Sequence, residues 1–114
     1  MLLVLNCFVF EDCAVGMISR GRGIEISTSQ FINNEIGAVF ENLTEELILK
    51  DCDIYSNTNN TLILNYDRNS VGHSSEVRNT KIHHNSLGSA FDGTAISLGD
   101  GPIDVINTTI YKNK

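Results

Sequence analysis

Apolar and polar residues alternate in several short runs of this chain. Two of these runs have their apolar residues at Ile24 and Ile26, and at Leu47 and Leu49. A period of two is typical of a β-strand that buries one face. The pattern therefore predicts a chain of short strands separated by polar turns.

Each run leads into a phrase that occurs five times. The phrase contains a small residue, with an apolar residue two positions later and Asn or Asp five positions later. Successive copies lie 22, 23, 28 and 28 residues apart, and a period of this length indicates a solenoid. The small-residue column is Cys7, Ser29, Cys52, Thr80 and Thr108; the apolar column is Val9, Phe31, Ile54, Ile82 and Ile110; the Asn/Asp column is Asp12, Asn34, Asn57, Asn85 and Asn113.

Two further columns precede the small residue in each copy. One position before it stands a polar residue, which can turn a corner because Asn and Asp tolerate left-handed backbone. Three positions before it stands an apolar residue of the preceding strand. The polar column is Asn6, Thr28, Asp51, Asn79 and Asn107, and the apolar one is Val4, Ile26, Leu49, Val77 and Val105.

Two solenoid folds have repeats of this length. Leucine-rich repeats require a framework of leucines that these copies lack. A parallel β-helix requires three short strands per rung, and a third strand can follow each recurrent asparagine, near Gly16, Gly37, Thr61 and Thr94. The sequence thus predicts an all-β, three-sided parallel β-helix of about five rungs, with Asn34, Asn57, Asn85 and Asn113 stacked and hydrogen-bonded along its axis.

The repeated phrase, small-x-(Ile or Phe)-x-x-Asn after an aliphatic strand, resembles the right-handed parallel β-helix repeat of the pectin-lyase-like superfamily. The resemblance covers nearly the whole chain. It implies a single domain over residues 1–114, which we expect to be a fragment of a longer helix, incomplete at both ends. That fold carries lyases, hydrolases, phage tailspikes and adhesins, so the resemblance implies little about activity.

Charge and hydropathy narrow the range of partners. The net charge is −6 and the eight Lys and Arg residues are scattered, which disfavours nucleic acid and anionic membranes. The opening MLLVLNCFVF lacks the basic start and the cleavage site of a signal peptide, and it is too short to span a bilayer. We expect no membrane insertion and, from the resemblance, an extracellular or cell-surface location.

The cysteines and histidines are candidates for chemistry. Cys7 and Cys52 are expected two rungs apart, about 9.6 Å at the usual strand spacing, which is too far for a disulfide. Cys13 has no partner at metal-binding spacing. His83 and His84 are weak binding candidates, because adjacent side chains on extended backbone seldom converge on one ion; His73 is an equally weak candidate.

The acidic residues are candidates for calcium or sugar chemistry. Asp92, Asp100 and Asp104 could bind calcium, although neighbouring glycines favour a solvated turn. The motifs that the hydrolases and lyases of this fold carry on successive rungs are absent. The sequence therefore predicts no catalytic residue, no bound metal and no cofactor other than calcium.

Three functions remain open. The first is a non-catalytic scaffold or recognition surface for a polysaccharide, a surface glycan or a protein. The second is a fragment of a polysaccharide lyase or glycoside hydrolase whose catalytic rungs lie elsewhere. The third is an adhesin passenger segment, suggested by the Phe-x-x-Asn unit at Phe31–Asn34. Long insertions from Tyr66 and Ser86 are candidate binding loops, and exposed rung ends predict end-to-end self-association or flanking rungs.

Overall fold

The computed structural model describes residues 2–21, 23–66, 75–86, 96–98 and 103–113. In these ranges all the regular elements are β-strands, and none is a helix. The prediction of an all-β chain is confirmed for this part of the sequence.

The strands form three parallel sheets. In stacking order, the first sheet contains β1 (Leu2–Asn6), β4 (Gly23–Ser27), β7 (Leu47–Lys50), β10 (Ser75–Arg78) and β13 (Ile103–Ile106). The second contains β2 (Val9–Glu11), β5 (Gln30–Ile32), β8 (Asp53–Tyr55), β11 (Lys81–His83) and β14 (Thr109–Tyr111). The third contains β3 (Val15–Arg20), β6 (Ile36–Leu43), β9 (Asn60–Tyr66) and β12 (Ile96–Leu98).

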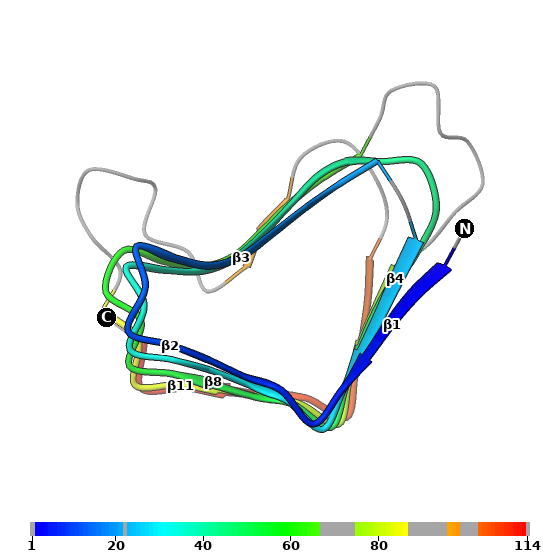
Figure 1. The fold of residues 1–114 in the computed structure, drawn as a ribbon. Helices are drawn as coiled ribbons and strands as arrows, with labels where there is room; N and C mark the ends of the chain where they lie inside the picture. The colour runs from blue at the N-terminus through cyan, green and yellow to red at the C-terminus, as the bar shows by residue number, and fades with distance from the viewer. Residues whose placement is uncertain (1, 22, 67–74, 87–95, 99–102, 114) are drawn as a thin grey trace.

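Consecutive strands always belong to different sheets, and every third strand returns to the same one. We call three consecutive strands, one in each sheet, a circuit. Figure 1 looks along the stacking direction, so that equivalent strands of successive circuits overlie one another and the sheets form three sides around the core. Equivalent residues of neighbouring circuits are therefore direct partners in the parallel ladders.

Two corners in each circuit use left-handed backbone. The first lies between the first and second sheets, and the second follows the second sheet. Of the eleven non-glycine residues with positive φ in the described part of the chain, ten occupy these corners, and the other is Asn42 at an irregularity in β6. The first corner contains Cys7, Thr28, Asp51, Asn79 and Asn107, and the second contains Asp12, Asn33, Ser56, His84 and Lys112. The corner role predicted for Thr28, Asp51, Asn79 and Asn107 is confirmed.

The register predicted for the first copy of the repeat is wrong by one residue. Leu5, not Val4, pairs with Ile26, and Phe10, not Val9, pairs with Phe31. A shift of one residue moves every side chain of a strand to the other face. The correct register places Leu3, Leu5 and Phe10 against the core and leaves Val4 and Val9 more than half exposed.

The same shift corrects the other columns of that copy. Cys7 replaces Asn6 at the first corner, with a φ of 61°, and is exposed. Phe8 stands where later circuits have a small residue, and its backbone N–H donates to Ser29 Oγ at 3.1 Å. Cys13, not Asp12, occupies the asparagine position, where its N–H donates to Asn34 Oδ1 at 3.0 Å.

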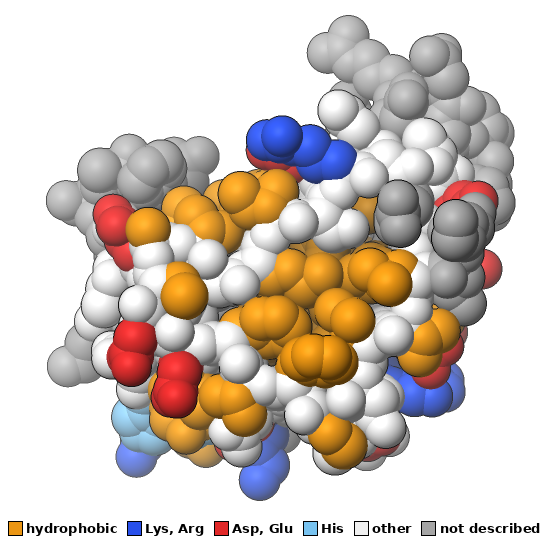
Figure 2. Space-filling model, in the orientation of Figure 1, with side chains coloured by type: hydrophobic (Ala, Val, Ile, Leu, Met, Phe, Trp, Pro, Cys, Tyr) orange, Lys and Arg blue, Asp and Glu red, His pale blue; other side chains and the backbone are white. Residues whose placement is uncertain are grey.

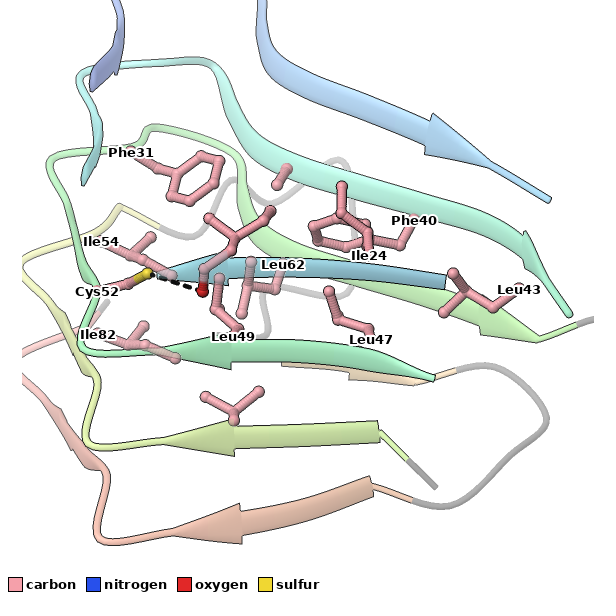
Figure 3. Packing of buried hydrophobic residues seen from close by; sticks show 13 residues of the cluster. Ile24, Phe31, Phe40, Leu43, Leu47, Leu49, Cys52, Ile54, Leu62 and Ile82 are labelled. Carbon is pink, nitrogen blue, oxygen red and sulfur yellow. Dashed lines mark hydrogen bonds between the residues drawn. The ribbon is translucent and has the colours of Figure 1, made fainter. Parts of the chain in front are cut away.

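Each sheet contributes at least one column of apolar side chains to the core (Figure 3). Phe31, Ile54 and Ile82 follow one another on the second sheet and are fully buried. The ring of Phe10 continues this column, with its centroid 4.9 Å from that of Phe31. The first sheet contributes Ile24, Ile26, Leu47, Leu49 and Val77, and the third contributes Ala38, Phe40, Leu43 and Leu62.

The predicted asparagine ladder is present at Asn34, Asn57, Asn85 and Asn113. Each side-chain oxygen accepts the backbone N–H of the equivalent residue one circuit earlier, as in Asn34 N–H to Asn57 Oδ1 at 3.0 Å. Each side-chain amide donates to a backbone carbonyl of the preceding circuit, as in Asn57 Nδ2 to Phe31 O at 3.1 Å. The bonds to the side-chain oxygens satisfy buried N–H groups at the second corner.

The small-residue column also forms hydrogen bonds. The hydroxyls of Ser29, Thr80 and Thr108 each donate to the carbonyl two residues earlier, at 2.9–3.0 Å. The Cys52 thiol makes the same contact with Lys50 O at 3.3 Å. These carbonyls also accept a backbone N–H of the preceding circuit, as Ser27 O does from Cys7 at 3.2 Å. The small side chain therefore adds a second hydrogen bond at the first corner of the circuits after the first.

We predict that Ile54→Ala lowers the free energy of unfolding by about 2–5 kcal/mol, because it opens a cavity within a fully buried column. The matched control is Ile18→Ala, because Ile18 is 51% exposed on β3; its cost should be under about 0.5 kcal/mol. Urea titration of both variants measures the difference. Equal losses would contradict the observed division between inward and outward residues.

Candidate functional site

A shallow groove of about 350 Å³ follows the first corner, on the outside of the molecule. It crosses three successive circuits. Two carboxylates, one ammonium group and several amide and hydroxyl groups are among its lining side chains. The lining residues are Thr28, Ser29, Gln30, Asp51, Cys52, Asp53, Asn79 and Lys81.

The sheet ladder positions the polar groups of the groove. Gln30, Asp53 and Lys81 are the first residues of β5, β8 and β11, and they are register partners. Their side chains form one row on the outer face of the second sheet, because Phe31 and its equivalents, one position later, face inward. Asp51 lies at the corner, with a φ of 55°. Neither Asp51 nor Lys81 forms an ion pair with another described residue.

A second outward row, two residues further along the same strands, contains stacked rings. The rings of Tyr55 and His83 have centroids 5.1 Å apart and lie within 12° of parallel. Those of His83 and Tyr111 are 5.0 Å apart and within 7°. The imidazole is thus held between two phenol rings, at one ring per circuit.

His83 connects the two rows. Its Nε2 lies 2.7 Å from Asp53 Oδ1, in the groove. Its Nδ1 lies 2.6 Å from Nδ1 of His84. Extended backbone would direct adjacent side chains apart, but His84 has a φ of 54°. The corner turns the His84 ring back, and its plane lies at 84° to that of His83.

Cys52 lies at the groove with its side chain buried. Burial raises the pKa of its thiol to about 11. Its sulfur lies near two backbone carbonyl oxygens, of Lys50 at 3.3 Å and of Ile26 at 3.8 Å (Figure 3). Cys7 and Cys13 are free and exposed. Cys7 is not in the column of Cys52, so the two-rung separation expected between them does not apply.

The remaining predicted candidates are not brought together. Asp92, Asp100 and His73 lie outside the described residues, as do most of the two long insertions. Asp104 is exposed on β13. In the described part of the chain no three His, Cys, Asp or Glu side chains are grouped closely enough to hold a metal ion.

The groove and the ring stack were missed by sequence reasoning. The signal for the stack is present, because Tyr55, His83 and Tyr111 occupy the same offset, three residues after Cys52, Thr80 and Thr108. The groove has no comparable signal, because its row contains an amide, a carboxylate and an ammonium group at equivalent positions.

Comparison of the chain with models of known protein families, with curated proteins and with solved structures finds no match. Across the described ranges there is also no helix long and apolar enough to cross a lipid bilayer.

We predict that a short pulse of iodoacetamide at pH 8 labels Cys7 and Cys13 but spares Cys52. The thiolate is the reacting species, and with a pKa of about 11 only about one Cys52 thiol in a thousand is ionised at pH 8. Peptide mass spectrometry identifies the labelled sites, and labelling in denaturant should reach all three. Equal rates at Cys52 and Cys13 in the folded chain would refute the buried position of Cys52.

Proposed function

We propose that this chain is a segment of a right-handed three-sided parallel β-helix of the pectin-lyase-like type, and that it acts as a non-catalytic scaffold whose outer face recognises a glycan. The cyclic order of strands, the three parallel sheets and the repeated corners support the architecture. Right-handed winding is the hand that parallel strand crossovers almost always take.

The observation that carries the recognition role is the polar groove across three circuits. Asp51, Asp53, Asn79, Gln30 and Lys81 supply donors and acceptors, and the ladder spaces them by about 4.8 Å per circuit, which is comparable with the length of one sugar unit. A rigid sheet fixes their positions before binding, which lowers the entropic cost of ordering them.

The charge of the groove favours a neutral glycan. Its side chains include two carboxylates and one ammonium group, and the chain as a whole carries a net charge of −6. A polyuronate would be repelled by this field. The stacked rings of Tyr55, His83 and Tyr111 cover one another's faces, so recognition beside the groove depends on hydrogen bonds at ring edges.

One observation favours the alternative of a carbohydrate-active enzyme fragment. The Asp53 carboxylate orients the His83 imidazole at 2.7 Å, and a carboxylate-oriented imidazole is a common general base. The described residues offer no nucleophile hydrogen-bonded to that imidazole. Binding without turnover is therefore the function we favour.

We predict that the chain binds neutral polysaccharide on a glycan array and that Lys81→Ala with Asp51→Ala weakens this binding at least about tenfold, through the loss of two charged hydrogen-bonding groups. The control is Arg20→Ala, which removes an exposed charge on the third sheet. The chain should release no reducing or unsaturated sugar from any polysaccharide, pectin and polygalacturonate included, with or without calcium. Unchanged binding in the double variant would refute the groove, and release that requires His83 would establish the enzyme alternative.

We also propose that the ends of the stack associate with further circuits, supplied by flanking sequence or by a second copy of the chain. β1, β2 and β3 are edge strands, and Figure 2 shows apolar side chains gathered in the middle of that end. At the other end Val105 continues the inward column of Leu49 and Val77 but is 47% exposed. Unpaired edges recruit other strands.

We predict that the purified chain self-associates at tens of micromolar in sedimentation velocity and that Val105→Lys reduces this association at least about tenfold, because the charge would be buried at the junction. Val4→Lys is the matched control, because Val4 lies on β1 at the opposite end but is 57% exposed on its outward side. A monomer at all concentrations would refute association between copies of the chain, and equal effects of the two lysines would refute the role of the inward column at the junction.

A further inference from the structure

We propose that His83 and His84 chelate a late first-row divalent cation, with Cu²⁺ bound most tightly and Zn²⁺ less so. The two Nδ1 atoms lie 2.6 Å apart. Two nitrogens that each lie about 2.1 Å from one ion at a right angle are about 3 Å apart. In the hydrogen bond between the two Nδ1 atoms the accepting lone pair points along the line that joins the two nitrogens. Widening the pair by a few tenths of an ångström and turning the exposed His84 ring would direct both lone pairs at one ion. The site adjoins the proposed glycan groove, because Asp53 lines the groove and also contacts His83, but metal binding does not require that a glycan binds.

Asp53 sets His83 in the form that binds a metal. Its Oδ1 lies 2.7 Å from His83 Nε2, so Nε2 carries the proton and donates it to the carboxylate. In the neutral tautomer that this hydrogen bond selects, Nδ1 of His83 has the lone pair, which faces His84. A carboxylate that holds the far nitrogen of a ligating histidine in this way orients the ring and increases its basicity.

The surroundings hold both rings in place before an ion arrives. His83 is stacked between Tyr55 and Tyr111, with centroids 5.1 and 5.0 Å away. His84 is turned toward it by the left-handed corner, and its ring meets that of Tyr111 edge-on at 5.7 Å. Chelation therefore requires the loss of the hydrogen bond between the two Nδ1 atoms, a shift of the His84 proton from Nδ1 to Nε2 through solvent, and a turn of the His84 ring, while the strands stay in place.

The donor set determines the class of cation. Two neutral imidazole nitrogens favour Cu²⁺, Ni²⁺ and Zn²⁺ over Mg²⁺ and Ca²⁺, which prefer oxygen. Within the described residues no third His, Cys, Asp or Glu completes the set. Water would fill the remaining positions, as at sites that leave room for an exogenous ligand.

The test is equilibrium dialysis of the full chain against Cu²⁺ and against Zn²⁺, with electron paramagnetic resonance of the Cu²⁺ form. We expect one ion per chain and a spectrum with two imidazole nitrogens. His84→Asn should weaken binding at least about tenfold, and Asp53→Ala about tenfold or more. Asn tolerates the left-handed corner, so His84→Asn keeps the fold, which circular dichroism checks.

The matched control is His73→Asn, since His73 is the other histidine of the chain; it should bind both ions like the parent chain. Parent-like binding by His84→Asn would overturn the proposal. So would equal losses in His84→Asn and His73→Asn, or a Cu²⁺ spectrum with one nitrogen.

Discussion

Stacking in register of equivalent residues is the constraint on which this structure depends. The chain leaves a strand at two corners per circuit, and just past these corners backbone N–H groups donate to side-chain oxygens instead of sheet carbonyls. The ladder oxygens accept those of the second corner, as Asn57 Oδ1 does from Asn34, and hydroxyls of the small-residue column accept those of the first, as Thr80 Oγ1 does from Cys52. An unsatisfied buried group costs about 1–3 kcal/mol, so a corner is stabilised when the next circuit presents Asn or a small polar side chain at the same place. The apolar columns are aligned as a consequence.

This constraint also explains what the sequence could predict. Inward positions repeat because each must match its neighbours above and below, so Phe31, Ile54 and Ile82, the recurrent asparagines and the corners at Thr28 and Asp51 were recognised from spacing alone. The first copy was misaligned because Cys7 imitates the small residue at Cys52, while its true equivalent, Phe8, is large. Burial of Phe10 against Phe31 decides that register, and packing of this kind is not contained in a local pattern.

The candidate site could not be predicted to the same degree, because outward positions are free of the stacking constraint. Gln30, Asp53 and Lys81 lie in one row but have an amide, a carboxylate and an ammonium group. No residue type recurs there, so the repeat pattern does not predict the groove. The contact between His83 and His84 depends on a positive φ at His84 and on a carboxylate thirty residues earlier. Both features arise from the corner geometry and the parallel ladder, and neither can be predicted from the two adjacent histidines in the sequence. The inner face thus specifies the fold, and the outer face can carry recognition or metal chemistry without altering it.

Equivalent residues contact only the circuits directly above and below them, which has a consequence for how the gene can change. Tandem duplication of a DNA segment encoding one circuit would insert a complete set of corner, ladder and core residues. The new copy would find the same neighbours that the old one had, and the downstream circuits would move along the axis as a body. Unequal recombination between the repeats could therefore alter the length of the outer surface in whole steps, whereas insertions between strands would alter only the loops.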